Sequence, residues 1–132
     1  MRIFKNKWFA KFAHKEHISD VKLCEVVTEA DRGRIDADYG GGVIKQRIAR
    51  PGQGKSGGYR SIIYYRRGDK AFFVYGFSKK DRDNIADDEA REFKRLAKIT
   101  LALSDAELVK LIANETYLEV HCHEEKADNN DN

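Results

Sequence analysis

The stretch YRSIIYYRRGDKAFFVYGFS (residues 59–78) decides how this 132-residue chain folds. It consists of two runs rich in β-branched and aromatic residues, which are typical of strands, on either side of Gly68 and Asp69. A Gly-Asp pair between two such runs is typical of a two-residue hairpin turn. The sequence therefore predicts an antiparallel hairpin formed by residues 59–67 and 70–78.

The pairing within this hairpin predicts which side chains share a face. A two-residue turn pairs Arg60 with Phe77, and it places Arg60 and Lys79 as diagonal neighbours on one open, solvent-facing surface. The same register pairs Ile62 with Tyr75, Tyr64 with Phe73 and Gly58 with Lys79. The opposite face, which could pack under helices, would then carry Ile63, Val74, Tyr65 and Phe72.

Just before the hairpin, the segment ARPGQGKSGGYR (residues 49–60) contains a Gly-Lys-Ser tripeptide reminiscent of nucleotide-binding P-loops. A P-loop has the pattern G-x-x-x-x-G-K-[ST] and leads directly into a helix, whose N-terminus faces the phosphate. Here Ala49 occupies the position of the first glycine, and strand-forming residues follow the tripeptide. The sequence therefore disfavours a P-loop and predicts a loop over residues 50–58, whose glycines allow the backbone to approach a phosphate in another way.

Charge is distributed unevenly along the chain. Residues 43–82 hold eleven Lys and Arg against two Asp and Glu, whereas residues 83–132 hold six against thirteen. Six of the eleven cations are arginines and aromatic residues lie between them, which favours an anionic partner such as nucleic acid over an ordinary lysine-rich surface. No apolar run approaches the roughly 20 residues of a membrane span, and no signal-peptide core is present, so we expect no membrane partner.

The rest of the chain predicts helices around a small sheet. Residues 1–5 and 43–49 are strand-like, and Trp8, Phe9, Phe12 and Ala13 recur at helical spacing. Ser19 is placed to cap a second helix that Gly33 can end, and residues 36–42 form a polar connection. A further helix begins near Asp87, a capping box from Ser104 to Glu107 begins another, and residues 117–120 form a last strand.

These elements predict one α+β domain over residues 1–120, in which a small antiparallel sheet is packed by an N-terminal helix pair and by C-terminal helices. The polar segment 121–132 is predicted to be a disordered tail. His121, Cys122, His123 and Glu124 are consecutive, so they cannot enclose a metal ion alone, and we expect no metal and no cofactor. Cys24 and Cys122 lack CxxC spacing, which argues against a disulfide framework and suits a reducing cytoplasm.

The residue types of the basic segment constrain any reaction on RNA. Attack by a 2′-hydroxyl needs a base, stabilisation of charge on the phosphate and an acid for the leaving oxygen. The segment has neither histidine nor glutamate, so lysine or tyrosine would have to transfer the protons. We expect Arg60 to hold the transition state, Lys55 to act as base or electrostatic activator, and Arg50 and Lys79 to hold phosphates.

Two motifs, ARPGQGKSGGYR (residues 49–60) and YGFSKKDRDNI (residues 75–85), resemble the RelE/ParE superfamily of bacterial type II toxins, in particular its RelE-like or HigB-like branch. The resemblance implies a RelE-like fold and a nuclease that cuts messenger RNA in the ribosome. It also implies an antitoxin partner, for which we expect a helix-turn-helix DNA-binding domain. The implied catalytic residues are Lys55, Arg60 and Arg50, and the expected RNA-binding residues are Lys45, Arg47, Lys79, Lys80 and Arg82.

Two alternatives remain open at the level of sequence. The superfamily includes gyrase inhibitors that share the fold, and a basic nucleic-acid-binding domain without a toxic role would have a similar composition. The resemblance also leaves the general acid unassigned. Tyr117 is the candidate nearest to the C-terminal tyrosine that some members use.

Overall fold

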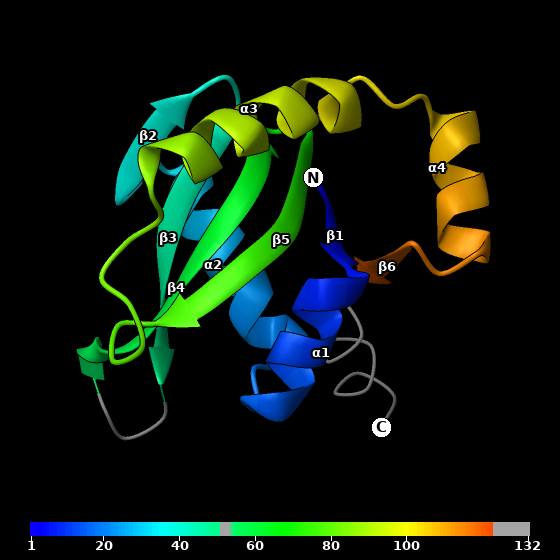
Figure 1. The fold of residues 1–132 in the computed structure, drawn as a ribbon. Coiled ribbons are helices and arrows are strands. Elements are labelled where there is room, and N and C mark those ends of the chain that lie inside the picture. The colour runs from blue at the N-terminus through cyan, green and yellow to red at the C-terminus, as the bar shows by residue number, and fades with distance from the viewer. Residues whose placement is uncertain (51–53, 123–132) are drawn as a thin grey trace, which may run out of the picture.

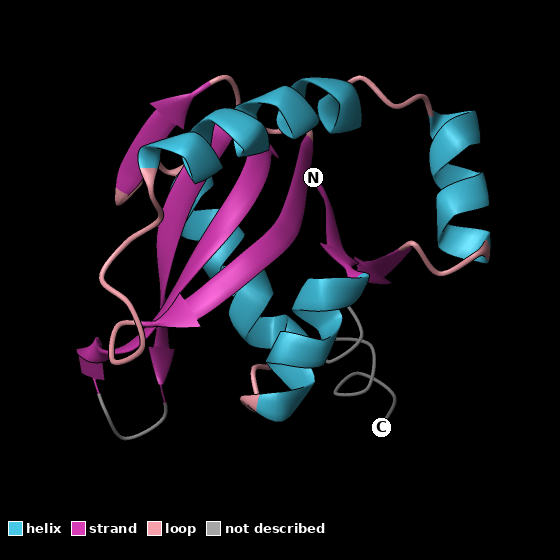
Figure 2. Cartoon of the chain, viewed as in Figure 1, coloured by secondary structure: helices cyan, strands magenta, loops and turns pink. Residues whose placement is uncertain are grey.

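The computed structural model describes residues 1–50 and 54–122, apart from the side chains of residues 54–56. It is an α+β fold, as predicted, with one six-stranded sheet in the order β2-β3-β4-β5-β1-β6 (Figures 1 and 2). Neighbouring strands are antiparallel except β1, which is parallel to β5. The elements are β1 (Arg2–Asn6), α1 (Lys7–Lys15), α2 (Asp20–Asp31), β2 (Ala37–Gly40), β3 (Val43–Arg50), β4 (Gly54–Arg66), β5 (Lys70–Ser78), α3 (Asp87–Leu101), α4 (Asp105–Ala113) and β6 (Tyr117–Val120).

Helices cover both faces of the sheet. Helices α1 and α2 pack on one face, where Phe9 and Leu23 are fully buried, and α3 crosses the other face (Figure 1). Beneath α3, Ile62 and Phe72 form a second core together with Leu108 from α4. The expectation of an open sheet face is therefore wrong, because the apolar side of α3 covers the strands that carry Ile62. We call the two sides the α1–α2 face and the α3 face.

The hairpin of β4 and β5 departs from its predicted register near the turn and returns to it after a bulge. Its turn has three residues, Arg67 to Asp69, so Arg66 pairs with Lys70 and Tyr64 with Phe72 rather than Phe73. The register then shifts by one residue between Ile62 and Ile63, at a bulge on β5. Beyond the bulge, the predicted pairs of Arg60 with Phe77 and of Ile62 with Tyr75 are confirmed.

The helix boundaries follow the predicted caps. The Ser19 hydroxyl accepts a hydrogen bond from the Lys22 amide, and Ser104 and Glu107 form a complete capping box. Gly33 follows α2 with a φ of +84°, which is the left-handed conformation that ends many helices. No helix in the described ranges is long and apolar enough to cross a membrane.

Two segments that were predicted as connections are strands. Residues 37–40 form β2, which pairs with β3 at the edge of the sheet, and β4 begins at Gly54 rather than near Tyr59. Residues 50 and 54–58 of the predicted loop thus belong to strands, and residues 51–53 lie outside the described residues. The Gly-Lys-Ser tripeptide thus lies on a strand and not before a helix, which confirms that it is not a P-loop.

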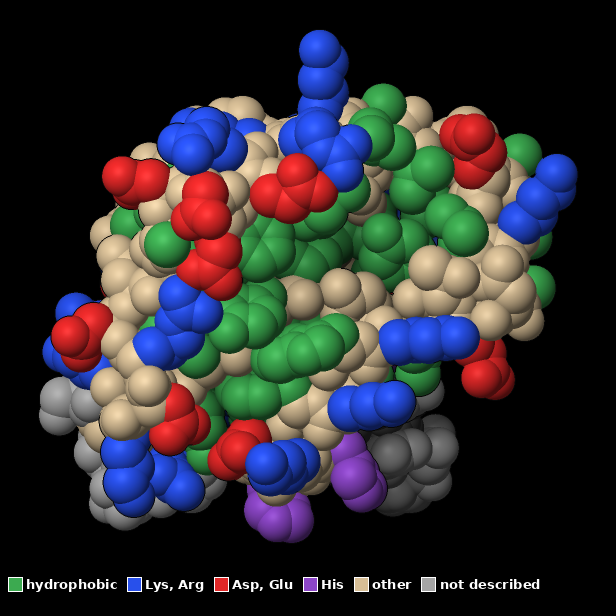
Figure 3. Space-filling model, in the orientation of Figure 1, with side chains coloured by type: hydrophobic (Ala, Val, Ile, Leu, Met, Phe, Trp, Pro, Cys, Tyr) green, Lys and Arg blue, Asp and Glu red, His purple; other side chains and the backbone are tan. Residues whose placement is uncertain are grey.

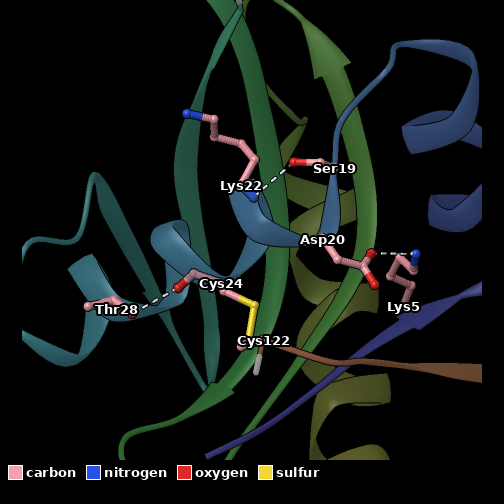
Figure 4. Close-up of a disulfide and its surroundings, with 7 residues drawn as sticks. All are labelled: Lys5, Ser19, Asp20, Lys22, Cys24, Thr28 and Cys122. Carbon is pink, nitrogen blue, oxygen red and sulfur yellow. Dashed lines mark hydrogen bonds and ion pairs between the residues drawn. A yellow bond between two sulfur atoms is a disulfide. The ribbon is translucent and has the colours of Figure 1, made fainter. Parts of the chain in front are cut away.

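A disulfide joins Cys24 of α2 to Cys122, which follows β6 (Figure 4). Their Cα atoms are 5.9 Å apart, although 98 residues separate them in sequence. The expectation that these cysteines do not pair is wrong. Their sequence spacing could not show the pairing, because the antiparallel pairing of β6 with β1 is what carries Cys122 to α2. Residues 123–132 of the predicted tail lie outside the described residues.

Candidate functional site

Four cations gather at the α3 face near the end of β3 and β4. In the β3–β4 register, Arg47 pairs with Arg60 and Lys45 with Ile62, so these side chains project to the same face. Burial lowers the pKa of Lys45, and the positive charge of Arg60 lowers it further. The Asp36 carboxylate opposes this lowering of the pKa, whereas Arg47 and Lys79 add to it, which places all three charges near the Lys45 ammonium. We refer to Lys45, Arg47, Arg60 and Lys79 as the basic cluster.

Arg60 is the most deeply buried member of the basic cluster. It is only 6% exposed, so the prediction that it faces solvent is wrong. Its Nη1 donates to the carbonyl oxygen of Tyr59 at 3.4 Å. Within residues 1–50 and 54–122, no carboxylate forms a salt bridge with it. A buried guanidinium without a carboxylate partner is unfavourable, and an anion placed beside it would relieve that cost.

Lys45 is held by an amide that the sequence analysis overlooked. Its Nζ donates to Oδ1 of Asn84 at 3.2 Å, and the Tyr39 hydroxyl donates to the same oxygen at 2.9 Å. Burial raises the pKa of Tyr39, and the hydrogen bond to Asn84 opposes part of that shift. The only sequence signal for Asn84 was its place within the motif of residues 75–85. Tyr39 had none, because residues 36–42 were taken for a connection.

Arg82, which was predicted to bind RNA, is engaged within the protein. It forms a two-pronged ion pair with Glu89 in the first turn of α3, and this raises the pKa of Arg82. Its Nη1 also donates to the Tyr75 hydroxyl at 3.2 Å, and the guanidinium lies 5.6 Å from the centre of the Phe77 ring. Arg82 therefore fastens the segment between β5 and α3 onto the sheet. Lys80, in the same segment, is exposed.

The structure does not bring Arg50 together with Arg60. The Arg50 guanidinium lies 5.5 Å from the centre of the Tyr59 ring, and Tyr59 belongs to the core of the α1–α2 face. The Tyr59 hydroxyl donates to Glu16 of the loop after α1 at 2.7 Å. Arg50 thus lies on the opposite side of the sheet from the basic cluster.

The two remaining candidates are Lys55 and Tyr117. The Lys55 side chain lies outside the described residues, although its backbone belongs to β4, the strand that carries Arg60. Tyr117 lies on β6, three strands from β4, and its ring packs edge-on against Phe4 and Phe72. The structure therefore separates Tyr117 from the basic cluster.

A cavity of about 650 Å³ opens on the α1–α2 face beside α2 and the disulfide. The charged side chains that line it pair with one another, as Arg34 does with Glu29 and Arg47 with Asp36. Its mixed charges do not select an anion. The basic cluster is the better candidate for phosphate, because Asp36, on Arg47, is the one carboxylate that forms a salt bridge with it within the described residues. In the part of the chain that the structure describes, no three His, Cys, Asp or Glu side chains gather as metal ligands.

Comparison with known proteins agrees with the α+β fold described above. A family model described as the RelE toxin of the RelE / RelB toxin-antitoxin system matches residues 1–120. A search of curated proteins found no match. The family match spans all six strands and all four helices.

Proposed function

The chain belongs to the RelE toxin family, and from that premise we propose that it is an endoribonuclease that cuts messenger RNA on the ribosome and thereby inhibits translation. Membership in a toxin-antitoxin family implies an antitoxin protein as partner. We further propose that this antitoxin carries a helix-turn-helix domain and that both proteins act in the cytoplasm, where ribosomes and messenger RNA meet.

The observation that carries this proposal is the buried, unpaired Arg60 within the basic cluster. Arg47 and Lys45 project from the neighbouring strand toward the same face. These three cations have one carboxylate beside them, Asp36 on Arg47, and a polyanion relieves the repulsion that remains. A guanidinium also suits a phosphate because it can form two parallel hydrogen bonds with its oxygens.

These residues divide the reaction among themselves. The 2′-oxygen attacks the adjacent phosphorus while the 5′-oxygen leaves, which yields a cyclic phosphate and a free 5′-hydroxyl. Arg60 and Arg47 stabilise the negative charge that builds on the phosphate. Lys45 accepts the 2′ proton, because its lowered pKa increases the fraction of neutral amine at neutral pH.

Three further roles complete the proposed site. The Tyr39 hydroxyl supplies a proton to the leaving oxygen, and its raised pKa makes it a weaker acid than an ordinary tyrosine. Lys79 and Lys80 hold flanking phosphates. Lys55 stays a proposed second base or electrostatic activator, since it precedes Arg60 on the same strand.

The ribosome supplies what these residues lack. Lysine and tyrosine have ordinary pKa values near 10, which match proton transfer at neutral pH poorly. Fixing the 2′-oxygen in line with the phosphate is worth up to about 7–11 kcal/mol in favourable cases. We therefore propose that RNA placed in the ribosome reacts much faster than free RNA.

The proposal is tested by incubating the purified protein with messenger RNA, with and without programmed ribosomes, at one fixed salt concentration, and mapping the new 5′ ends. We expect cuts at defined codon positions only with ribosomes. An Arg60→Met variant should not cut. Arg66→Met is its matched control, because Arg66 is an exposed arginine at the other end of β4. Fast cleavage of free RNA would contradict ribosome dependence, and no cleavage together with inhibited DNA supercoiling would favour a gyrase inhibitor.

A further inference from the structure

An exposed tryptophan on α1 lies beside the second half of β5. Strand β1 pairs with β5 from Lys70 to Phe73, and α1 then follows alongside the rest of β5. The Asn6 side-chain amide donates to the Val74 carbonyl at 3.1 Å, which fixes the start of α1 there. A Cβ on Gly76 would come within 2.5 Å of the Phe12 ring, so the helix approaches the strand closely. This contact places Trp8 against Tyr75.

The Trp8 ring is held in place and yet remains accessible. It is 45% exposed, although its centre lies 4.7 Å from that of Tyr75 and 5.4 Å from that of Phe12. Hydrophobic side chains gather in the middle of the face that Figure 3 shows, and both basic and acidic side chains surround them. Trp8 is therefore a large aromatic ring that is fixed by its neighbours and about half exposed, which leaves part of it free for a binding partner.

Packed side chains link Trp8 to the basic cluster, and Phe77, which lies between them, is only 4% exposed. The Tyr75 ring lies 6.0 Å from Phe77, which pairs with Arg60 on β4. Tyr75 is also anchored by Arg82, whose Nη1 donates to its hydroxyl. A path of neighbouring side chains therefore leads from Arg60 through Phe77 and Tyr75 to Trp8, all on the α3 face or at its rim.

Cations beside accessible rings suit single-stranded RNA. Its phosphates bind cationic side chains, and its unpaired bases stack on aromatic rings whatever their sequence. On α1, Lys7 and Lys11 are exposed on either side of Trp8. A partner that is both anionic and aromatic fits these charges better than an apolar protein helix does.

We propose that Trp8, backed by Tyr75, is a stacking platform for an unpaired base of the RNA whose phosphates the basic cluster holds. This inference rests on the proposed function for its RNA substrate, and it adds a base-binding subsite outside the reacting centre. Trp8 is a positioning residue, because it orients the strand and touches no reacting atom.

Trp8 reports its own occupancy, because it is the single tryptophan of the chain. The test titrates the protein with a 2′-O-methylated hexa-adenylate, which cannot be cut, and follows tryptophan fluorescence. An abasic oligomer of equal length carries the same phosphates without bases. We expect quenching by the hexa-adenylate alone. Equal quenching by both oligomers, or by neither, would overturn the inference.

Variants separate stacking from charge. Binding of a fluorescein-labelled hexa-adenylate, measured by anisotropy, should weaken roughly 5-fold or more for Trp8→Ala, the effect of losing one stacked base. Trp8→Phe should keep most of the affinity because it keeps a ring. Ile99→Ala is the control, since Ile99 is an exposed apolar residue of α3, 57% exposed. Unchanged binding in Trp8→Ala, with its melting temperature also unchanged, would contradict the proposal.

The two proposals fail in different ways. If the protein cuts ribosome-bound RNA but its fluorescence does not respond to the hexa-adenylate, the stacking platform is wrong and the nuclease stands. If the fluorescence responds but no RNA is cut on ribosomes, the stacking platform stands and the nuclease is wrong. A loss of antitoxin binding in Trp8→Ala, without a loss of RNA binding, would assign this surface to the protein partner instead.

Discussion

At the scale of single residues, Arg60 combines burial with an unpaired charge. Such a side chain destabilises the fold, because a buried charge lacks the water that would solvate it. Its presence therefore suggests a role in binding or catalysis. Arg60 also lies near the ammonium of Lys45, whose pKa it lowers. We therefore expect stability and activity to respond to this residue in opposite directions.

The first prediction is that Arg60→Met abolishes RNA cleavage and growth inhibition while keeping or raising the melting temperature. Methionine fills a similar space without the charge, and replacing buried ions by apolar residues is often neutral or stabilising by about 1–4 kcal/mol. Thermal unfolding monitored by circular dichroism measures the effect. Arg66→Met, at the exposed end of β4, should change neither property. A stable Arg60→Met protein that still cuts RNA would remove Arg60 from the site.

The second prediction concerns pH. Because the pKa of Lys45 is lowered, its amine begins to lose its proton at a lower pH than an ordinary lysine. If the neutral amine is the base, single-turnover cleavage on ribosomes should rise as pH increases from neutrality toward the lysine pKa. Lys45→Arg, which stays protonated, should be slower by roughly 100-fold or more and lose that rise. A wild-type rate that is flat with pH would leave Lys45 with only an electrostatic role.

The sequence predicted part of this site. Arg60, Arg47, Lys45 and Lys79 were named because cations are concentrated in residues 43–82, and the structure gathers them at one end of the sheet. Arg50 was misplaced because the predicted strand ended at residue 49. With β3 extending to Arg50, alternation puts Arg50 on the same face as Ile48 and opposite Arg47. The burial of Arg60 was not predictable either, because a strand pattern does not reveal what packs over a strand.

At the scale of elements, the β4–β5 hairpin shows how two errors can cancel. The Gly-Asp pair suggested a two-residue turn, but the turn has three residues. A bulge near Val74 then restores the predicted strand pairing. Helix caps were predicted correctly because each depends on a few adjacent residues, such as Ser19. Pairing of distant strands, including the parallel contact of β1 with β5, carries no comparable local signal.

The third prediction concerns two glycines at close contacts. A Cβ on Gly58 would lie 2.2 Å from the Ile48 carbonyl oxygen on β3, whereas a Cβ on Gly76 meets only the end of the Phe12 ring. Backbone cannot move aside as a side chain can, so Gly58→Ala should destabilise the fold by about 1–3 kcal/mol and more than Gly76→Ala does. Urea unfolding of both variants gives the comparison. The opposite ranking would show that β3 and β4 separate more easily than α1 and β5.

The fourth prediction concerns the Arg2–Glu119 pair, which links β1 to β6 by two hydrogen bonds of 2.9 Å. The hydrogen bond from Arg2 lowers the pKa of Glu119, so its contribution to stability is present above the ordinary glutamate pKa and is lost as pH falls through the lowered value. Both groups are partly exposed, and we expect only about 0.5–1 kcal/mol. The difference in melting temperature between the wild type and Glu119→Gln should therefore shrink on going from pH 7 to pH 3. A constant difference would mean that the pair does not contribute through its charge.

At the scale of the whole molecule, the disulfide closes a loop that spans most of the chain. In the chain-entropy view, a cross-link over 98 residues stabilises the fold by about 4–5 kcal/mol. The fifth prediction is that dithiothreitol lowers the melting temperature of the wild type to that of Cys122→Ser, which should not respond to it. Because the bond lies on the α1–α2 face, cleavage of RNA should be the same in both redox states. A loss of cleavage on reduction would show that the disulfide supports the site.

The strand order has a consequence for how the protein folds during its translation. Strand β1 is made first, yet its partners are distant: Asn6 meets Val74 across 68 residues, and Arg2 meets Glu119 across 117. Contacts so far apart in sequence form late and slowly. The strands β3, β4 and β5 can associate while the chain is still being extended, but the sheet is completed only when β6 has emerged from the exit tunnel. A newly made molecule therefore completes its sheet only after β6 has left the ribosome, long after β1 has done so.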